Sequence, residues 1–260
     1  MNIDLTGKRA FVCGSTKGIG KAVAIELARL KAQVILLARN ENELKNVAAE
    51  LDASNSHTYL VVDFTRPDEL KKKVIDFIAA SGPIHILVNN TGGPPGGPIT
   101  GAQTAEFIQA FSNHLICNQI LAQAVIDGMK KQQYGRIINI ISTSVKQPLK
   151  GLGVSNTVRA AVANWSKTWA NEVAAYGITV NNVLPGATRT DRLLSIIESN
   201  SSKSGSSISE VTERMQQEIP MKRFAQPEEI ANAVAFLASP AASYITGINV
   251  PVDGGRTSSL

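Results

Sequence analysis

The sequence predicts a single α/β domain built on a doubly wound, seven-stranded parallel sheet. Short segments rich in β-branched residues alternate with longer amphipathic segments along the chain. The strand-like segments are apolar throughout, which is typical of parallel strands that have helices on both faces. No linker-like stretch divides the 260 residues, so we expect one domain over residues 1–260.

The strands and helices follow from this alternation in order. An apolar run at 8–13 predicts the first strand, and a helix with an apolar stripe follows at 18–31. The remaining strands are expected at 33–38, 57–62, 84–90, 135–142, 178–184 and 247–253. Helices are expected at 41–53, from Pro67, at about 104–131, at about 155–175 and from Pro227.

Two of the connecting segments carry further signals. Before the third helix, Thr65 is a candidate N-cap, and Pro67 suits a first turn because its missing N–H has no partner to lose there. The low-complexity run SNSSKSGSSIS, at 199–209, interrupts the pattern after the sixth strand. We interpret it as part of a flexible lid over about 188–225, because ligands bind beyond the C-terminal ends of such strands. The alternative is a disordered insertion.

Composition excludes several classes of protein. No apolar run reaches the roughly 18 residues of a membrane span, and the N-terminus lacks an export signal, so we expect no membrane partner and a cytoplasmic location. Cys13 and Cys117 have neither disulfide-framework nor metal-ligand spacing, so no metal is expected. The net charge is +5, but the densest basic run, Lys71–Lys73, has acidic neighbours, which indicates a solvated helix face and no nucleic-acid partner.

A glycine-rich turn follows the first predicted strand and opens directly into a helix. Glycines there let the backbone approach a pyrophosphate, and the helix N-terminus offers free N–H groups with partial positive charge. In this strand–turn–helix context the turn indicates a dinucleotide site of the Rossmann-fold type. The expected binding residues are Gly14, Ser15, Thr16, Lys17, Gly18, Ile19 and Gly20.

The end of the second strand favours NADP(H) over NAD(H). An acidic residue there would hydrogen-bond the ribose 2′-hydroxyl of NAD, but the chain has Ala38 followed by Arg39. Arg39 is suited to a charge-assisted contact with a 2′-phosphate. Lys17 would add a second cation. The alternative is that both are solvated surface cations.

Several motifs in the expected order resemble the short-chain dehydrogenase/reductase family over the whole chain. They are GSTKGIG, VVDFT, VNNTGG with Thr91 in place of an alanine, NNVLPG, and a tail at 219–255 similar to 3-oxoacyl-[acyl-carrier-protein] reductase-like members. The resemblance implies an NADP(H)-dependent oxidoreductase acting on a carbonyl or alcohol, usually as a homodimer or homotetramer. It also implies cofactor contacts at Asp63, Phe64, Asn90, Thr91, Gly92, Pro185 and Gly186.

The catalytic positions of that family hold different residues here. Ser142 fits the family serine, but the tyrosine position falls on Ser155 and the lysine position on Arg159. The asparagine position falls on His114, with Asn113 one residue away. A serine hydroxyl is a far weaker acid than a tyrosine, and arginine is a planar fork rather than a point charge.

The proton donor is therefore the open question of the sequence. The unperturbed pKa of a histidine is in the right range, so His114 is one candidate acid if it lies near Ser142. Lys146 and Lys150, on the loop after Ser142, are others. Arg159 is also expected to bind the cofactor ribose. The alternative function is a non-catalytic NADP(H)-binding sensor or partner subunit that has lost the Tyr/Lys pair.

Overall fold

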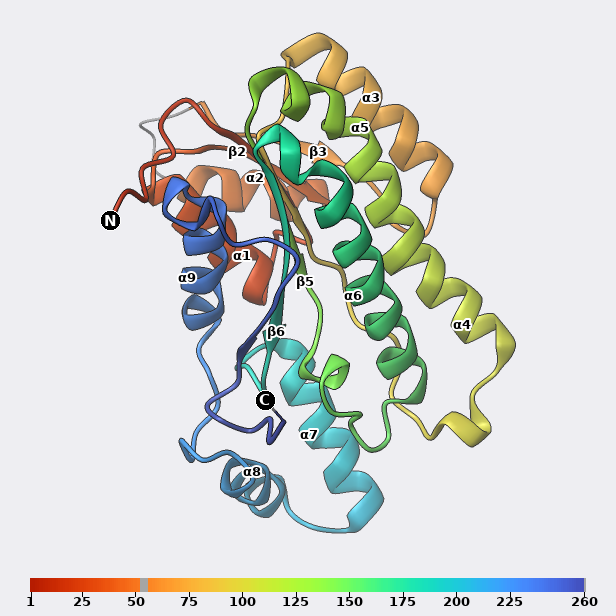
Figure 1. Ribbon diagram of the computed structural model, residues 1–260. Coiled ribbons are helices and arrows are strands. Elements are labelled where there is room, and N and C mark those ends of the chain that lie inside the picture. Colours follow the sequence, from red (N-terminus) through yellow and green to blue (C-terminus); the bar gives the residue numbers. More distant parts are fainter. Residues whose placement is uncertain (52–55, 260) are drawn as a thin grey trace.

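The computed structural model describes residues 1–51 and 56–259 and contains the predicted sheet (Figure 1). Its seven strands are all parallel, in the order β3-β2-β1-β4-β5-β6-β7. The order reverses between β1 and β4, which is where a doubly wound sheet opens a crevice at its strand C-termini. The strands are β1 Arg9–Cys13, β2 Gln33–Ala38, β3 Thr58–Val61, β4 Ile86–Asn89, β5 Gly135–Ile140, β6 Ile178–Pro185 and β7 Asn249–Val252.

Helices cover both faces of the sheet, so the strands are apolar on both sides. Ala10 and Val12 of β1 pack in the cluster that contains α1, α2 and α9, whereas Phe11 and Cys13 pack with α3, α5 and α6 (Figure 1). The longer helices are α1 Gly18–Arg29, α2 Glu41–Glu50, α3 Pro67–Ser81, α4 Thr104–Phe111, α5 Cys117–Gln132, α6 Gly153–Val173, α7 Asp191–Ser204, α8 Ile208–Gln217 and α9 Pro227–Ala238.

Three sequence expectations differ from this structure. The helix expected at 104–131 is divided by a π-helical turn, Ser112–Ile116, between α4 and α5. The segment expected as a flexible lid is folded, because α7 and α8 bury a separate apolar cluster around Val211. Thr65 is not the N-cap of α3, since Arg66 occupies that position and the Thr65 hydroxyl donates to Asp63 instead; Pro67 is at the first turn as expected. Residues 52–53 of the expected second helix lie outside the described residues.

A row of asparagines joins four neighbouring strands inside the sheet. The Asn89 amide donates to Asn139 at 2.8 Å, Asn139 to Asn182 at 2.9 Å, and Asn182 to Asn249 at 2.8 Å. These residues are strand partners in register, so each amide satisfies the next. The row fixes the relative positions of β4, β5, β6 and β7 beside the C-terminal ends that form the site.

The family resemblance implies an oligomer interface on α5 and α6, at Ile120, Leu121, Val125, Trp165 and Trp169, and these residues divide into two groups. Leu121 and Val125 face this chain's own core and are almost fully buried. Trp165 and Trp169 are partly buried, and both indole N–H groups donate to the Gln119 side chain, which ties α6 to α5. Across the part of the chain that the structure describes, no helix combines the length and apolar character needed to cross a membrane.

Candidate functional site

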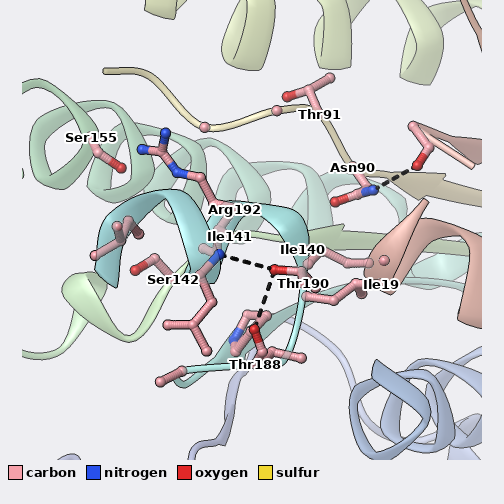
Figure 2. Close-up of a pocket in the computed structure, with 18 of the residues that line it drawn as sticks. Ile19, Asn90, Thr91, Ile140, Ile141, Ser142, Ser155, Thr188, Thr190 and Arg192 are labelled. Atoms are coloured by element: carbon pink, nitrogen blue, oxygen red, sulfur yellow. Dashed lines mark hydrogen bonds between the residues drawn. The ribbon is translucent and has the colours of Figure 1, made fainter. Parts of the chain in front are cut away.

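A cavity of about 430 Å³ lies at the strand C-termini, where the predicted motifs converge (Figure 2). Its floor comes from the ends of β1, β4, β5 and β6, and its walls come from the first turns of α1, α6 and α7. Pro185 and Gly186, expected beside a nicotinamide, line it at the end of β6. The cavity therefore occupies the place where a doubly wound sheet binds its ligands.

The glycine turn is shaped by close packing as well as by backbone conformation. Gly14 and Gly18 have φ values of +57° and +51°, in the left-handed region that favours glycine. A Cβ on Gly20 would lie 2.1 Å from the Gly14 carbonyl oxygen, so no side chain fits there. Lys17, Gly18 and Ile19 line the cavity, whereas Ser15 and Gly20 are buried inside the turn.

A second hollow adjoins the first and holds the residues expected around adenine and its ribose. Thr16, Arg39, Asp63 and Phe64 all line it. Burial opposes ionisation of Asp63, but hydrogen bonds from Thr65 and the charge of Arg39 hold the pKa of its carboxyl below the usual value. Lys17 does not line this hollow; its ammonium pairs with the Glu43 carboxylate at 3.2 Å. Arg39 is therefore the cation best placed for a 2′-phosphate.

The segment after β4 links the two hollows. Asn90 donates its amide to the carbonyls of Cys13 and Gly14, both at 3.3 Å, and so holds the glycine turn against β4. Asn90, Thr91 and Gly92 line both hollows, as expected for residues beneath a bound dinucleotide.

Ser142, Ser155 and Arg159 meet in the cavity, as their spacing predicts. The Ser142 hydroxyl accepts a hydrogen bond from the Ser144 N–H at 3.1 Å, which leaves its proton available to a ligand. Ser155 and Arg159 lie one turn apart on α6 and share a face. Both replace larger or differently shaped groups of the family, yet both line the cavity.

The Arg159 guanidinium is buried with few partners. It is 8% exposed, Nη1 donates to the Ile140 carbonyl at 3.1 Å, and Nε is buried without a partner among the described residues. Burial and, to a smaller extent, the charge of Arg192 together lower the pKa of Arg159 to about 10. The group stays cationic at pH 7 and has unspent hydrogen-bonding capacity.

His114 lies under this site rather than in it. It occupies the π-helical turn, is 3% exposed, and shares a 2.6 Å hydrogen bond between Nδ1 and the Thr91 hydroxyl. Burial and the charge of Arg159 lower the pKa of His114 to about 3. Asn113 faces the adenine-side hollow instead, so the inward residue of this turn is His114. With this lowered pKa the ring is neutral at pH 7, below the range that an unperturbed histidine would offer to a proton donor.

Other candidate acids lie away from the cavity. Lys146 and Lys150 do not line it. All four tyrosines fall within the described residues, and none of them lines the cavity either. Tyr134, for example, donates its hydroxyl to the Ala238 carbonyl on the far side of α9. Among the described residues, the cavity therefore holds no tyrosine that could act as the family's proton donor.

The first turn of α7 contributes residues that the sequence analysis did not single out. Thr190 caps this helix, accepting from the Leu193 N–H at 3.4 Å and donating to the Thr188 carbonyl at 3.2 Å (Figure 2). Arg192 extends from the same turn and donates to the Pro94 carbonyl at 2.6 Å. The cue in the sequence is the short distance from the Pro185–Gly186 turn to the first helical residues.

Comparisons with known proteins agree with this geometry. A family model described as enoyl-(acyl carrier protein) reductase matches residues 14–257. The NADPH-dependent reductase BacG of Bacillus subtilis (strain 168) is 31% identical, over 98% of this chain and 100% of that protein. The 3-oxoacyl-[acyl-carrier-protein] reductase FabG of Rickettsia bellii is 34% identical, over 97% and 98% respectively.

Solved structures give the same result. The L-sorbose reductase of Gluconobacter frateurii, complexed with NADPH and L-sorbose, superimposes with a TM-score of 0.92 at 31% identity, over all of both chains. Motifs, fold and cavity thus agree with the relatives along the whole length of the sequence. The chain belongs to the short-chain dehydrogenase/reductase family.

Proposed function

We propose that this chain is an NADP(H)-dependent oxidoreductase that reduces a small carbonyl compound without a tyrosine proton donor. The observation that carries the proposal is the single cavity that joins the glycine turn to Ser142, Ser155 and Arg159. A dinucleotide lying across the sheet would place its reactive end beside these side chains.

The chain's own residues fit this cofactor. The close approach of Gly20 to Gly14 leaves a flat backbone surface at the N-terminus of α1, suited to a pyrophosphate. The expected preference for NADP(H) rests on Arg39 and is confirmed by relatives named for NADPH, the reductase BacG and the sorbose reductase solved with NADPH. When bound, the cofactor supplies the hydride, and the protein handles the oxygen and the proton.

Ser142 and Arg159 are assigned to the substrate oxygen. The Ser142 hydroxyl donates a hydrogen bond to the carbonyl, and the Arg159 cation stabilises the negative charge that develops on the oxygen. One further N–H group of Arg159 is assigned to the ribose hydroxyls, which leaves other N–H groups for the substrate. These contacts are preorganised because the Ile140 carbonyl and the buried position hold the guanidinium in place.

The proton is assigned to a water molecule held by the Ser155 hydroxyl. Ser155 is too short to replace a tyrosine ring, which leaves room for water between it and the substrate. With hydride supplied to the carbonyl carbon by the bound cofactor, the substrate oxygen would take a proton from this water, and the resulting hydroxide would leave to solvent. Neutral His114 supports this arrangement by fixing the hydroxyl of Thr91 beside the cofactor path.

The competing function is a non-catalytic NADP(H)-binding sensor or partner subunit. It is favoured by one observation, that no tyrosine lines the cavity within the described residues and that His114, held neutral, lies outside it. In either case we expect homodimers or homotetramers in the cytoplasm. Light scattering in solution and fractionation of the source cells test these two expectations.

NADPH oxidation with 3-oxoacyl thioesters and simple ketones tests the function. We expect turnover by the wild type and a loss of about 100-fold or more in Ser142→Ala, the range for removing one oxyanion donor. Lys150→Gln, a charge change on the neighbouring loop outside the cavity, keeps wild-type turnover. Turnover in Ser155→Tyr/Arg159→Lys but not in the wild type would favour the non-catalytic function.

A further inference from the structure

We propose that the substrate of this reductase carries a carboxylate, which Arg192 and Arg159 bind over Gly93. The inference rests on the proposed carbonyl reduction and names the class of compound that the same cavity accepts: a short oxo acid. It starts from two guanidinium groups on different helices that converge on one point of the cavity wall.

Gly93 marks that point. A Cβ built on Gly93 would have Nε and Nη2 of Arg192 at 3.7 Å and Nη2 of Arg159 at 3.9 Å as its nearest neighbours. The space over this glycine is thus bounded by N–H donors from both side chains. A carboxylate presents two coplanar acceptor oxygens, which is the shape that a pair of guanidinium forks recognises.

The charges at this point lack a counter-ion. Arg159 is buried, and its Nε is unpartnered among the described residues. Arg192 uses only its Nη2 group, which donates to the Pro94 carbonyl, and its charge lowers the pKa of Arg159. Asp191 also lines the cavity but makes no ion pair with either arginine within the described part of the chain. Two like charges facing one cavity are stabilised when an anion lies between them.

The position separates this anion from those of the cofactor. The pyrophosphate is expected at the glycine turn, on the side of Ile19. Figure 2 shows the Arg192 guanidinium directed toward Ser155 and away from Ile19. The arginines therefore flank the substrate end of the cavity. Because about 430 Å³ must accommodate the nicotinamide end as well, the acid is small.

Matched pairs of ligands test the inference apart from turnover. We would load the protein with NADPH and follow its fluorescence while adding 3-hydroxybutyrate or 3-hydroxybutyramide, which cannot be reduced. The acid is expected to bind about 10- to 100-fold more tightly than the amide, the range for hydrogen bonds to a charged group. The same preference is expected in kcat/KM for acetoacetate over acetoacetamide.

Variants at Arg192 and Gly93 assign the preference to this position of the cavity. Arg192→Gln is expected to bring the ratio of the affinities for acid and amide toward one, and Arg192→Lys is expected to restore part of the preference for the acid. Arg189→Gln, an exposed arginine three residues earlier that does not line the cavity, leaves the ratio unchanged. Alanine fits the backbone at Gly93, but its methyl group would fill the position of the anion. Gly93→Ala is therefore expected to weaken binding of the acid more than binding of the amide.

The outcomes separate the two proposals. Turnover of neutral ketones with equal affinity for acid and amide would keep the reductase and overturn the carboxylate site. Acid-selective binding to the NADPH complex without turnover of any pair would keep the carboxylate site and count against carbonyl reduction. Failure of every acid in a chain-length series to bind the NADPH complex would also overturn the inference.

Discussion

Lowering the pH should destabilise this protein through His114 in a way that can be calculated. The folded chain holds the ring neutral, with its pKa lowered to about 3, first by burial and second by the charge of Arg159. The unfolded chain protonates the same ring near its usual value of 6.5. Below that value the unfolded state binds one proton more than the folded state, so stability falls as the pH falls.

The size of the effect follows from the two pKa values. Each pH unit between them costs about 1.4 kcal/mol, so lowering the pH from 7 to 5 removes about 2 kcal/mol of the free energy of unfolding. The loss is complete only near the folded-state pKa, and above about pH 7 the group contributes no pH dependence.

Urea unfolding followed by tryptophan fluorescence at pH 7 and pH 5 measures this difference. His114→Gln keeps a side chain that hydrogen-bonds to the Thr91 hydroxyl but does not titrate, so it should lose about 2 kcal/mol less than the wild type over this interval. His57→Gln controls for the removal of a histidine remote from the cavity and should keep the wild-type loss. An identical pH dependence in wild type and His114→Gln would refute the buried, neutral ring.

Three further predictions address the cofactor site and the sheet. Arg39→Gln should weaken NADPH binding about 10- to 100-fold with little effect on NADH, and Lys17→Gln should act less because that lysine is paired with Glu43; fluorescence titration of both cofactors checks this. Gly20→Ala should destabilise the protein by about 3 kcal/mol and weaken NADPH binding, because the added Cβ would meet the Gly14 carbonyl. Wild-type affinity for NADPH in this variant would contradict the role of the glycine turn in binding the cofactor. Asn139→Ala should lower the free energy of unfolding in urea by about 2–4 kcal/mol, because it leaves the buried amides of Asn89 and Asn182 without their Asn139 partner. An unchanged free energy of unfolding would contradict a structural role for the asparagine row.

Periodicity located the strands because each is a short, mostly apolar run. The five central strands are largely buried, whereas the edge strands β3 and β7 are only partly buried. β2 begins and ends at the predicted residues, and the glycine turn follows β1 as expected. Periodicity also found α5, but it did not detect the π-helical turn before it. A π-helical turn inserts one extra residue into the helix, and the apolar stripe continues across it with little change. The pattern of apolar residues therefore does not reveal the turn.

The serine-rich segment shows where composition misleads. Serine disfavours a helix interior and suggests a loop, yet α7 forms because Leu193 and Ile197 pack on Val211 of α8. Tertiary packing outweighs the low local propensity there. The same packing brings Arg192 over the cavity, and for this reason the sequence alone did not identify the arginine pair.

Contacts between substituted positions were equally hidden. Thr91 and His114 each depart from the family pattern, and only the structure shows that they share one hydrogen bond. The family resemblance implied that Ser142, Ser155 and Arg159 share a site, and in the structure all three line the same cavity. The chemical roles of these five positions stay predictions.

Transfer of deuterium from NADPH labelled at nicotinamide C4 tests the central claim most directly. The wild-type protein would be incubated with each of the two labelled epimers and a panel of oxo acids and ketones, and the products examined by mass spectrometry. The account predicts that one epimer transfers its deuterium to the carbinol carbon of a product, although the cavity holds no tyrosine. Tight NADPH binding with no label in any product, alongside label transfer by Ser155→Tyr/Arg159→Lys on the same panel, would contradict it.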